Sequence, residues 1–187
     1  MKSNITLIGM PGAGKSTTGI ILAKILAMGF IDTDVLIQIN EQRTLQQILD
    51  SDGYLALRRI EEQEILRLNV SHQVIATGGS AIYSHAAMTH LQQISTIVYI
   101  DVPYHELCRR IDNFASRGIA RASNQSFADL YHERQPLYQR YADLTIADTG
   151  QNQELVAQQI AADVRQHCTS LLHDGNQTCQ QSNQLNR

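Results

Sequence analysis

The sequence predicts a three-layer α/β sandwich in which helices cover both faces of a parallel sheet. Two observations lead to this prediction: short β-branched runs alternate with longer helical runs, and no Pro/Gly/Ser linker divides the chain. We expect strands at residues 4–8, 30–32, 73–76, 96–101 and 144–147. We expect helices at residues 16–27, 44–51, 53–69, 84–91, 104–112, 126–141 and 151–166, with Thr44, Ser84 and Ser126 as N-caps.

The composition is that of one globular domain. Of the 187 residues, 43% are hydrophobic and 18% are charged. No signal peptide is recognisable and no apolar stretch approaches the roughly 20 residues that span a bilayer. The three cysteines lack metal spacing, so we expect reduced thiols in a cytoplasmic protein without a membrane partner. We expect the domain at residues 1–168 and a disordered Asn/Gln-rich tail at 169–187.

The charge is unevenly distributed. The chain carries a net charge of −3, which argues against nucleic acid as a partner. Residues 109–140 nevertheless hold six arginines and no lysine against three acidic residues, a local balance of +3. Planar guanidinium groups suit phosphate or carboxylate recognition. A solvated helical face is the simpler alternative, and a nucleic-acid site is a further one.

Residues 9–17 read GMPGAGKST and match the phosphate-binding pattern GxxxxGK[ST] between a strand and a helix. The loop's N–H groups and the helix N-terminus favour an anion, Lys15 can neutralise the β- and γ-phosphates, and Ser16 can join a Mg²⁺ shell. The expected ATP-binding residues here are Gly12, Ala13, Gly14, Lys15, Ser16 and Thr17. No NKxD segment of a GTPase and no Walker B acidic pair follow, which favours a small-metabolite kinase.

Two carboxylates follow the second expected strand. Asp32 and Asp34 should lie near the phosphate loop, because parallel strands carry ligands at their carboxyl ends. One of them can hold Mg²⁺ while the other accepts the proton of an attacking hydroxyl. The alternative for both is a capping role at the start of the next helix.

An arginine and a glycine pair complete the candidate acceptor site. Arg58 and Glu61 are three residues apart in an expected helix, where Glu61 could hold the guanidinium for a substrate carboxylate. A surface ion pair is the alternative. Gly78 and Gly79 follow the third strand and let backbone N–H groups approach a ligand, or simply form a turn.

Together these motifs resemble the shikimate kinase family from about residue 4 to residue 166. The shared patterns are GxxGxGKST, FxDTD, LRxxE, TGG, a loop arginine and ERxPLYxxYAD. The resemblance implies a P-loop kinase with strand order 2-3-1-4-5 that uses ATP and Mg²⁺ to phosphorylate the 3-hydroxyl of shikimate. It also implies a lid at about residues 112–125 that closes over ATP.

The resemblance further implies a role for each matching residue. Lys15, Asp34 and Arg117 would be catalytic, with Asp34 receiving the acceptor hydroxyl. Arg58, Gly79 and Arg134 would bind shikimate beside Asp34, and Glu61 would support Arg58. Arg110, Arg117 and Gln151 would lie on the nucleotide side, and Ser16 and Asp32 would hold the metal.

Several positions depart from the family pattern. Gly78-Gly79-Ser80 stands where the family has three glycines, and the lid reads Arg117-Gly118-Ile119-Ala120 in place of RPLL. Leu57 and Tyr54 replace the usual Phe and Glu. Two alternatives therefore stay open: a related kinase for another hydroxy acid or sugar acid such as gluconate, and a nucleotide-binding paralogue with weakened catalysis. No self-association stripe is visible, and we expect a monomer.

Overall fold

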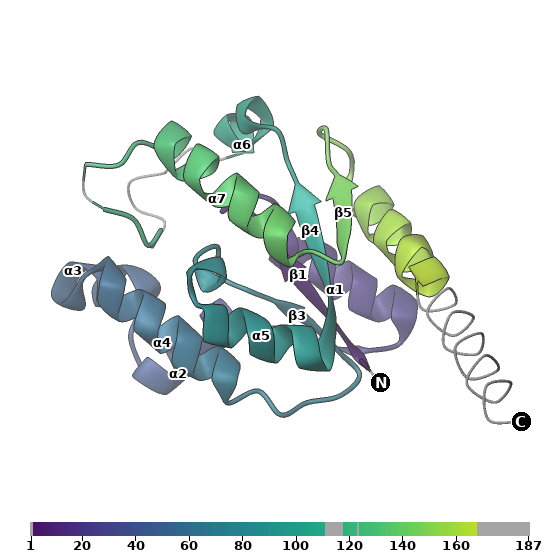
Figure 1. The fold of residues 1–187 in the computed structure, drawn as a ribbon, viewed down its shortest axis with the longest axis horizontal. Helices are drawn as coiled ribbons and strands as arrows, with labels where there is room; N and C mark the ends of the chain where they lie inside the picture. Colours follow the sequence, from purple (N-terminus) through teal and green to yellow (C-terminus); the bar gives the residue numbers. More distant parts are fainter. Residues whose placement is uncertain (1, 111–117, 123, 168–187) are drawn as a thin grey trace, which may run out of the picture.

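The computed structural model describes residues 2–110, 118–122 and 124–167, and a five-stranded parallel sheet lies at its centre (Figure 1). The strands are β1 (Asn4–Ile8), β2 (Gly29–Asp32), β3 (Gln73–Ala76), β4 (Ser95–Asp101) and β5 (Leu144–Ala147). They pair in the order β2-β3-β1-β4-β5, and every pairing is parallel. This confirms the strand order that the resemblance implied, and each strand lies within one residue of its expected bounds.

Helices cover both faces of the sheet. They are α1 (Lys15–Leu26), α2 (Thr33–Glu41), α3 (Leu45–Asp52), α4 (Tyr54–Leu66), α5 (His85–Ile94), α6 (Tyr104–Arg110), α7 (Phe127–Tyr141), the short 3₁₀ turn η1 (Ala81–Tyr83) and the helical residues 153–167. In Figure 1, α1 and residues 153–167 lie on one side of the sheet, and α5 and α7 lie on the other. The predicted three-layer sandwich is confirmed.

The central strand β1 is buried along its whole length, as a strand covered on both faces must be. Its two polar residues are satisfied by partners from distant segments. The Asn4 amide donates to the Val70 and Ile94 carbonyl oxygens at 2.8 and 3.0 Å, and the Thr6 and Ser95 hydroxyls are 2.7 Å apart. Burial of these groups is therefore compatible with a stable core.

The three predicted N-caps are confirmed, whereas α2 was not predicted. Thr44, Ser84 and Ser126 each accept a backbone N–H in the first turn of the following helix. Helix α2 begins because the Asp32 side chain accepts the N–H groups of Asp34 and Val35, at 3.0 and 3.4 Å. The β-branched residues of α2 obscured the helical pattern in the sequence.

A second apolar cluster lies beside the main core. It joins Ile37 of α2, Ile48 of α3 and Leu57 of α4 to Ala120. Residues 118–122 therefore pack against helices α2–α4 without forming a helix or strand themselves. Residues 112–117 of the expected lid and the expected tail at 169–187 lie outside the described residues.

Within residues 2–110, 118–122 and 124–167, no helix combines the length and the apolar character that crossing a bilayer requires.

Candidate active site

A cleft of about 820 Å³, measured out to its open mouth, lies at the carboxyl edge of the sheet. Its walls come from the loop before α1, the first turn of α2, one face of α4, residues 77–80, residues 118–120 and Arg134 of α7. Segments that are far apart in the sequence therefore meet here, because parallel strands all end at this edge.

The phosphate-binding loop has the backbone geometry that its glycines permit. Gly12 and Gly14 adopt φ of 83° and 86°, in the left-handed region that favours glycine. Gly14 occupies the N-cap of α1 and supplies no side-chain cap, so the first N–H groups of the helix remain available to an anion. Ser16 and Thr17 are exposed and line the cleft.

Lys15 is buried in the loop that it belongs to. Its ammonium group donates to the Gly9 and Met10 carbonyl oxygens at 2.8 and 3.0 Å. Burial lowers the pKa of Lys15 to about 8, although the nearby Asp34 charge acts in the opposite direction. A phosphate in the loop would offer this ammonium group a stronger partner than two carbonyl oxygens.

The two aspartates of the FIDTD segment have different environments. Asp32 caps α2, as the capping alternative proposed, and Asp34 lines the cleft. Burial and the neighbouring Asp32 charge raise the pKa of Asp34 to about 6, while Lys15 opposes this shift. A carboxylate with a raised pKa that faces a phosphate loop suits the acceptance of a hydroxyl proton.

Glu61 of α4 also faces the cleft and is 2% exposed. One carboxylate oxygen accepts a hydrogen bond from the Ser80 hydroxyl. Among the described residues, no hydrogen-bond partner reaches the other oxygen, Oε1. Burial and then the Asp34 charge raise the pKa of Glu61 to about 7, whereas the Ser80 hydrogen bond opposes the rise.

Arg58 does not pair with Glu61, and that expectation was wrong. The Arg58 guanidinium lies 3.6 Å from the centre of the Tyr83 ring and lines a neighbouring hollow with Tyr54 and Glu133. The cation–π contact with Tyr83 draws Arg58 away, and Glu61 turns toward Ser80. Arg58 therefore borders the cleft without lining it.

Arg134 lies inside the cleft wall, with 1% of its surface exposed. It donates to the Ala120 carbonyl oxygen at 2.7 Å and to the Tyr83 hydroxyl at 3.3 Å. Tyr83 thus contacts both arginines to which the family resemblance assigned substrate binding. This role of Tyr83 could not be predicted from the sequence, because the contacts depend on how η1 packs against α7.

Gly79 has no room for a side chain. A Cβ atom at this position would lie 2.9 Å from Arg134 Nη1 and 2.9 Å from Pro11 Cδ. The Gly79 carbonyl oxygen accepts the Tyr138 hydroxyl at 2.7 Å, which fixes this stretch of backbone. Packing against Arg134 and Pro11 therefore accounts for the glycine, and Gly79 itself lines the cleft.

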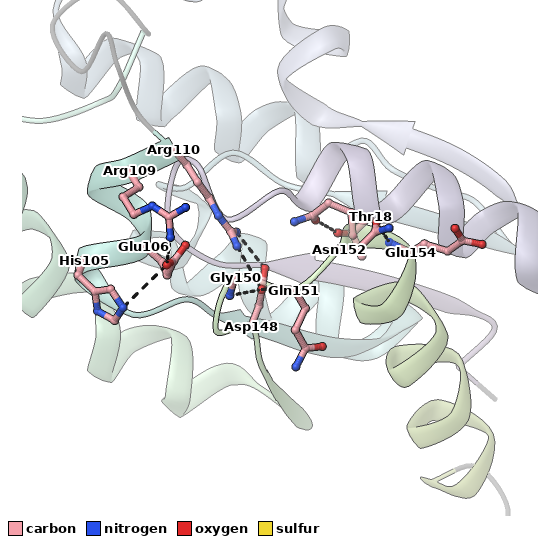
Figure 2. Close-up of polar contacts among 11 residues, drawn as sticks. Thr18, His105, Glu106, Arg109, Arg110, Asp148, Gly150, Gln151, Asn152 and Glu154 are labelled. Atoms are coloured by element: carbon pink, nitrogen blue, oxygen red, sulfur yellow. Dashed lines mark hydrogen bonds and ion pairs between the residues drawn. The ribbon is translucent and has the colours of Figure 1, made fainter.

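Arg110, the last residue of α6, points toward Asp148, which follows β5 (Figure 2). It donates two hydrogen bonds to Asp148, of 2.9 and 3.1 Å, and Asp148 also accepts the N–H groups of Gly150 and Gln151. In Figure 2 the Gln151 amide points away from this pair. Asp148 was not predicted from the sequence, and only its position directly after β5 could have indicated it.

Gln153 lies beside the phosphate-binding loop. Gln153 accepts a hydrogen bond from Thr18 and covers Gly14, where an added Cβ would lie 2.4 Å from its side-chain oxygen. The sequence did not indicate Gln153. Arg117 lies outside the described residues, so its predicted role stays a prediction.

Comparisons with known proteins agree with this geometry. Residues 11–165 match the family model described as "Shikimate kinase". A shikimate kinase of Paracidovorax citrulli is 35% identical over 84% of this chain and 90% of its own length, and one of Thiobacillus denitrificans is 34% identical over 78% and 81%.

Solved structures give the same result. A shikimate kinase from Acinetobacter baumannii, determined in complex with shikimate, has a TM-score of 0.78 and 31% identity over 91% of this chain and 94% of its own. A gluconokinase from Sinorhizobium meliloti is more distant, with a TM-score of 0.53 and 16% identity over 93% of this chain and 99% of its own. This second likeness concerns the fold alone.

Proposed function

The chain belongs to the shikimate kinase family, and we propose from this premise that it transfers the γ-phosphoryl group of ATP to the 3-hydroxyl of shikimate. Its family relatives are phosphotransferases, and gluconokinases are more distant from it than shikimate kinases are. The observation that carries the proposal is one cleft that contains both the phosphate-binding loop and Asp34, with Arg134 in its wall.

In the proposed reaction, Asp34 orients the attacking hydroxyl and accepts its proton. The hydroxyl oxygen forms a bond to the γ-phosphorus, the bond from that phosphorus to the bridging oxygen breaks, and ADP leaves. Such transfers have a loose transition state, so positioning and charge neutralisation supply most of the catalysis. Lys15 and the N–H groups at the start of α1 would stabilise the transferring group, and Arg117 is proposed to do so from the lid.

Arginine is suited to hold the substrate carboxylate, because its planar group can donate two parallel hydrogen bonds. Arg134 supports this role, since it is buried in the cleft wall. Arg58 would have to leave the Tyr83 ring to contribute as well. Gly79 lines the cleft, so its backbone would approach the ring hydroxyls from there.

ATP and Mg²⁺ are the proposed nucleotide and metal. Mg²⁺ usually takes few protein ligands and retains phosphate oxygens and water. The exposed Ser16 hydroxyl at the start of α1 fits such a shell. Asp32, the last residue of β2, is the second proposed ligand. When bound with ATP, the metal would neutralise charge on the phosphates. Arg110 and the loop at Gln151 would lie beside the base.

The domain bounds at 1–168, a cytoplasmic location and a monomeric state remain part of this proposal. Size-exclusion chromatography with light scattering measures the last of these directly.

A coupled assay of ADP release tests the proposed function. The unmutated chain with ATP-Mg²⁺ should turn over shikimate far faster than gluconate or hydroxy-amino acids. Faster turnover of another acid would transfer the assignment to a related kinase. ATP binding without turnover of any acceptor would favour a paralogue with weakened catalysis.

A further inference from the structure

The buried carboxylate of Glu61 has one oxygen that lacks a partner. Glu61 is 2% exposed, and within the described part of the chain nothing donates a hydrogen bond to Oε1. Buried polar atoms are rarely left unpaired, because the loss of hydration is then uncompensated. Among the described residues, Arg58 Nε on the same helix is a buried donor that also lacks a partner, so Oε1 is open either to Arg58 or to a donor that arrives with the ligand.

This oxygen lies next to the proposed catalytic carboxylate. A Cβ atom built on Gly78 would be 2.2 Å from Glu61 Oε1 and 2.6 Å from Asp34 Oδ1. The two carboxylates thus converge above the same α-carbon, and both line the cleft. A ligand with neighbouring hydroxyls could donate one to each carboxylate.

Ser80 fixes the orientation of Glu61. The serine is 7% exposed, and its hydroxyl donates to Glu61 Oε2. Its backbone has an ordinary φ of −102°, so a glycine is not required there. The family pattern has a third glycine at this position, and the serine adds a hydroxyl group to it. Because this hydroxyl binds Glu61 Oε2, the other oxygen, Oε1, points toward Gly78 and Asp34.

We propose that Ser80 is a positioning residue that holds Glu61 as a second hydroxyl-binding group beside Asp34. Asp34 then receives the reacting hydroxyl, and Glu61 Oε1 accepts a hydrogen bond from the adjacent hydroxyl of the same molecule. This assignment rests on the proposed function and specifies how the site selects a vicinal diol. It differs from the role expected from the sequence, in which Glu61 supports Arg58.

The Ser80 hydrogen bond also favours the ionised form of Glu61. The charged or titratable groups that act on this carboxylate are Asp34, Lys15, Arg134 and Tyr138. Burial raises the pKa of Glu61 to about 7, and loss of the Ser80 donor would raise it further. A variant without the hydroxyl should therefore hold Glu61 protonated near neutral pH, and a protonated carboxyl is a weaker acceptor.

The test compares shikimate with the deoxy analogue that lacks the hydroxyl next to the reacting one. For each acceptor, kcat/KM is measured with the unmutated chain, Ser80→Ala and Ser80→Gly. We expect the preference for shikimate over the analogue to fall about tenfold in both variants at pH 7, the size of one charge-assisted hydrogen bond. The KM for ATP should not change, and the difference should shrink at pH 9, where Glu61 ionises without help.

Ser95→Ala is the matched control. Ser95 is a buried serine that donates to the Leu91 carbonyl oxygen, and it lies outside the cleft. Its loss should reduce stability without changing the preference between the two acceptors. If a Ser80 variant folds poorly, Glu61→Gln provides the second measurement, since a neutral amide should weaken the same preference.

The outcomes separate this inference from the proposed function. Turnover of shikimate by the unmutated chain, with the same preference in the Ser80 variants and Glu61→Gln, would overturn the inference alone. No turnover of shikimate by the unmutated chain would overturn the proposed function and this assignment together.

Discussion

Replacement of Asp34 by asparagine should make the protein more stable and nearly inactive. The side chain is partly buried, and its pKa rises from 3.8 to about 6 in the folded chain. Because the folded-state value is the higher one, ionised Asp34 destabilises the fold. This destabilisation is absent below the unfolded pKa of 3.8, grows as the pH rises and is complete above pH 6.

The magnitude follows from the size of the pKa shift. The rise from 3.8 to about 6 is about two units, and each unit corresponds to about 1.4 kcal/mol. The folded state is therefore destabilised by at most about 3 kcal/mol at pH 8, less for the solvent exposure that the side chain retains. Asparagine carries no charge, so Asp34→Asn should recover most of this free energy of unfolding.

Activity should change in the opposite direction. Loss of the proposed proton acceptor should lower kcat by about 10²- to 10⁴-fold, while ATP binding stays nearly intact. In the unmutated chain, a pKa of about 6 leaves roughly a tenth of Asp34 ionised at pH 5. The acid limb of kcat/KM for shikimate should therefore fall about tenfold per pH unit below pH 6.

Urea unfolding of both proteins at pH 4 and pH 8 provides the assay, together with calorimetric titration of ATP-Mg²⁺. The stability gain of Asp34→Asn should be near zero at pH 4 and large at pH 8. A gain that is equal at both pH values would refute the linkage, and wild-type turnover by the variant would falsify the catalytic role.

Three further substitutions test other parts of the cleft. Gly78→Ala should abolish acceptor binding, because its Cβ would lie 2.2 Å from Glu61 Oε1. ATP should still protect this variant against thermal unfolding, and tight shikimate binding by it would contradict the geometry. Arg134→Lys should raise the KM for shikimate by about tenfold or more with little effect on the KM for ATP, since lysine lacks the planar fork of arginine. Steady-state kinetics measure both constants, and equal changes in the two KM values would argue against a role of Arg134 in holding the substrate carboxylate. Asp148→Asn should weaken the two hydrogen bonds to Arg110, which we propose to lie beside the base. The KM for ATP should therefore rise severalfold while the binding of pyrophosphate stays unchanged, and a parallel loss of pyrophosphate binding would indicate a structural role.

Much of the fold was predictable because its determinants are local. The strands are short runs rich in β-branched and other apolar residues, and the caps at Thr44, Ser84 and Ser126 are short-range hydrogen bonds. Helix α2 was missed because its β-branched residues have low helical propensity, and the Asp32 cap outweighs that propensity in the folded chain.

The candidate site was predictable in its members and less so in its contacts. Asp34 and Arg134 line the cleft as expected. The expected Arg58–Glu61 pair does not form, because Arg58 packs on Tyr83 and Glu61 accepts a hydrogen bond from Ser80. Helical spacing places both side chains near one face of α4. Arg58 nevertheless has a stronger partner in Tyr83 of η1, and Glu61 has one in Ser80, which precedes η1.

The sequence by itself determined the phosphate-binding loop, the parallel sheet and the class of chemistry, since these depend on contiguous residues with fixed backbone requirements. Only the tertiary structure decided which side chain each buried charge contacts. Those partners come from segments far apart in the chain, and their choice depends on burial and packing that no local pattern contains. The convergence of Asp34 and Glu61 above Gly78, with Ser80 behind them, belongs to this second group.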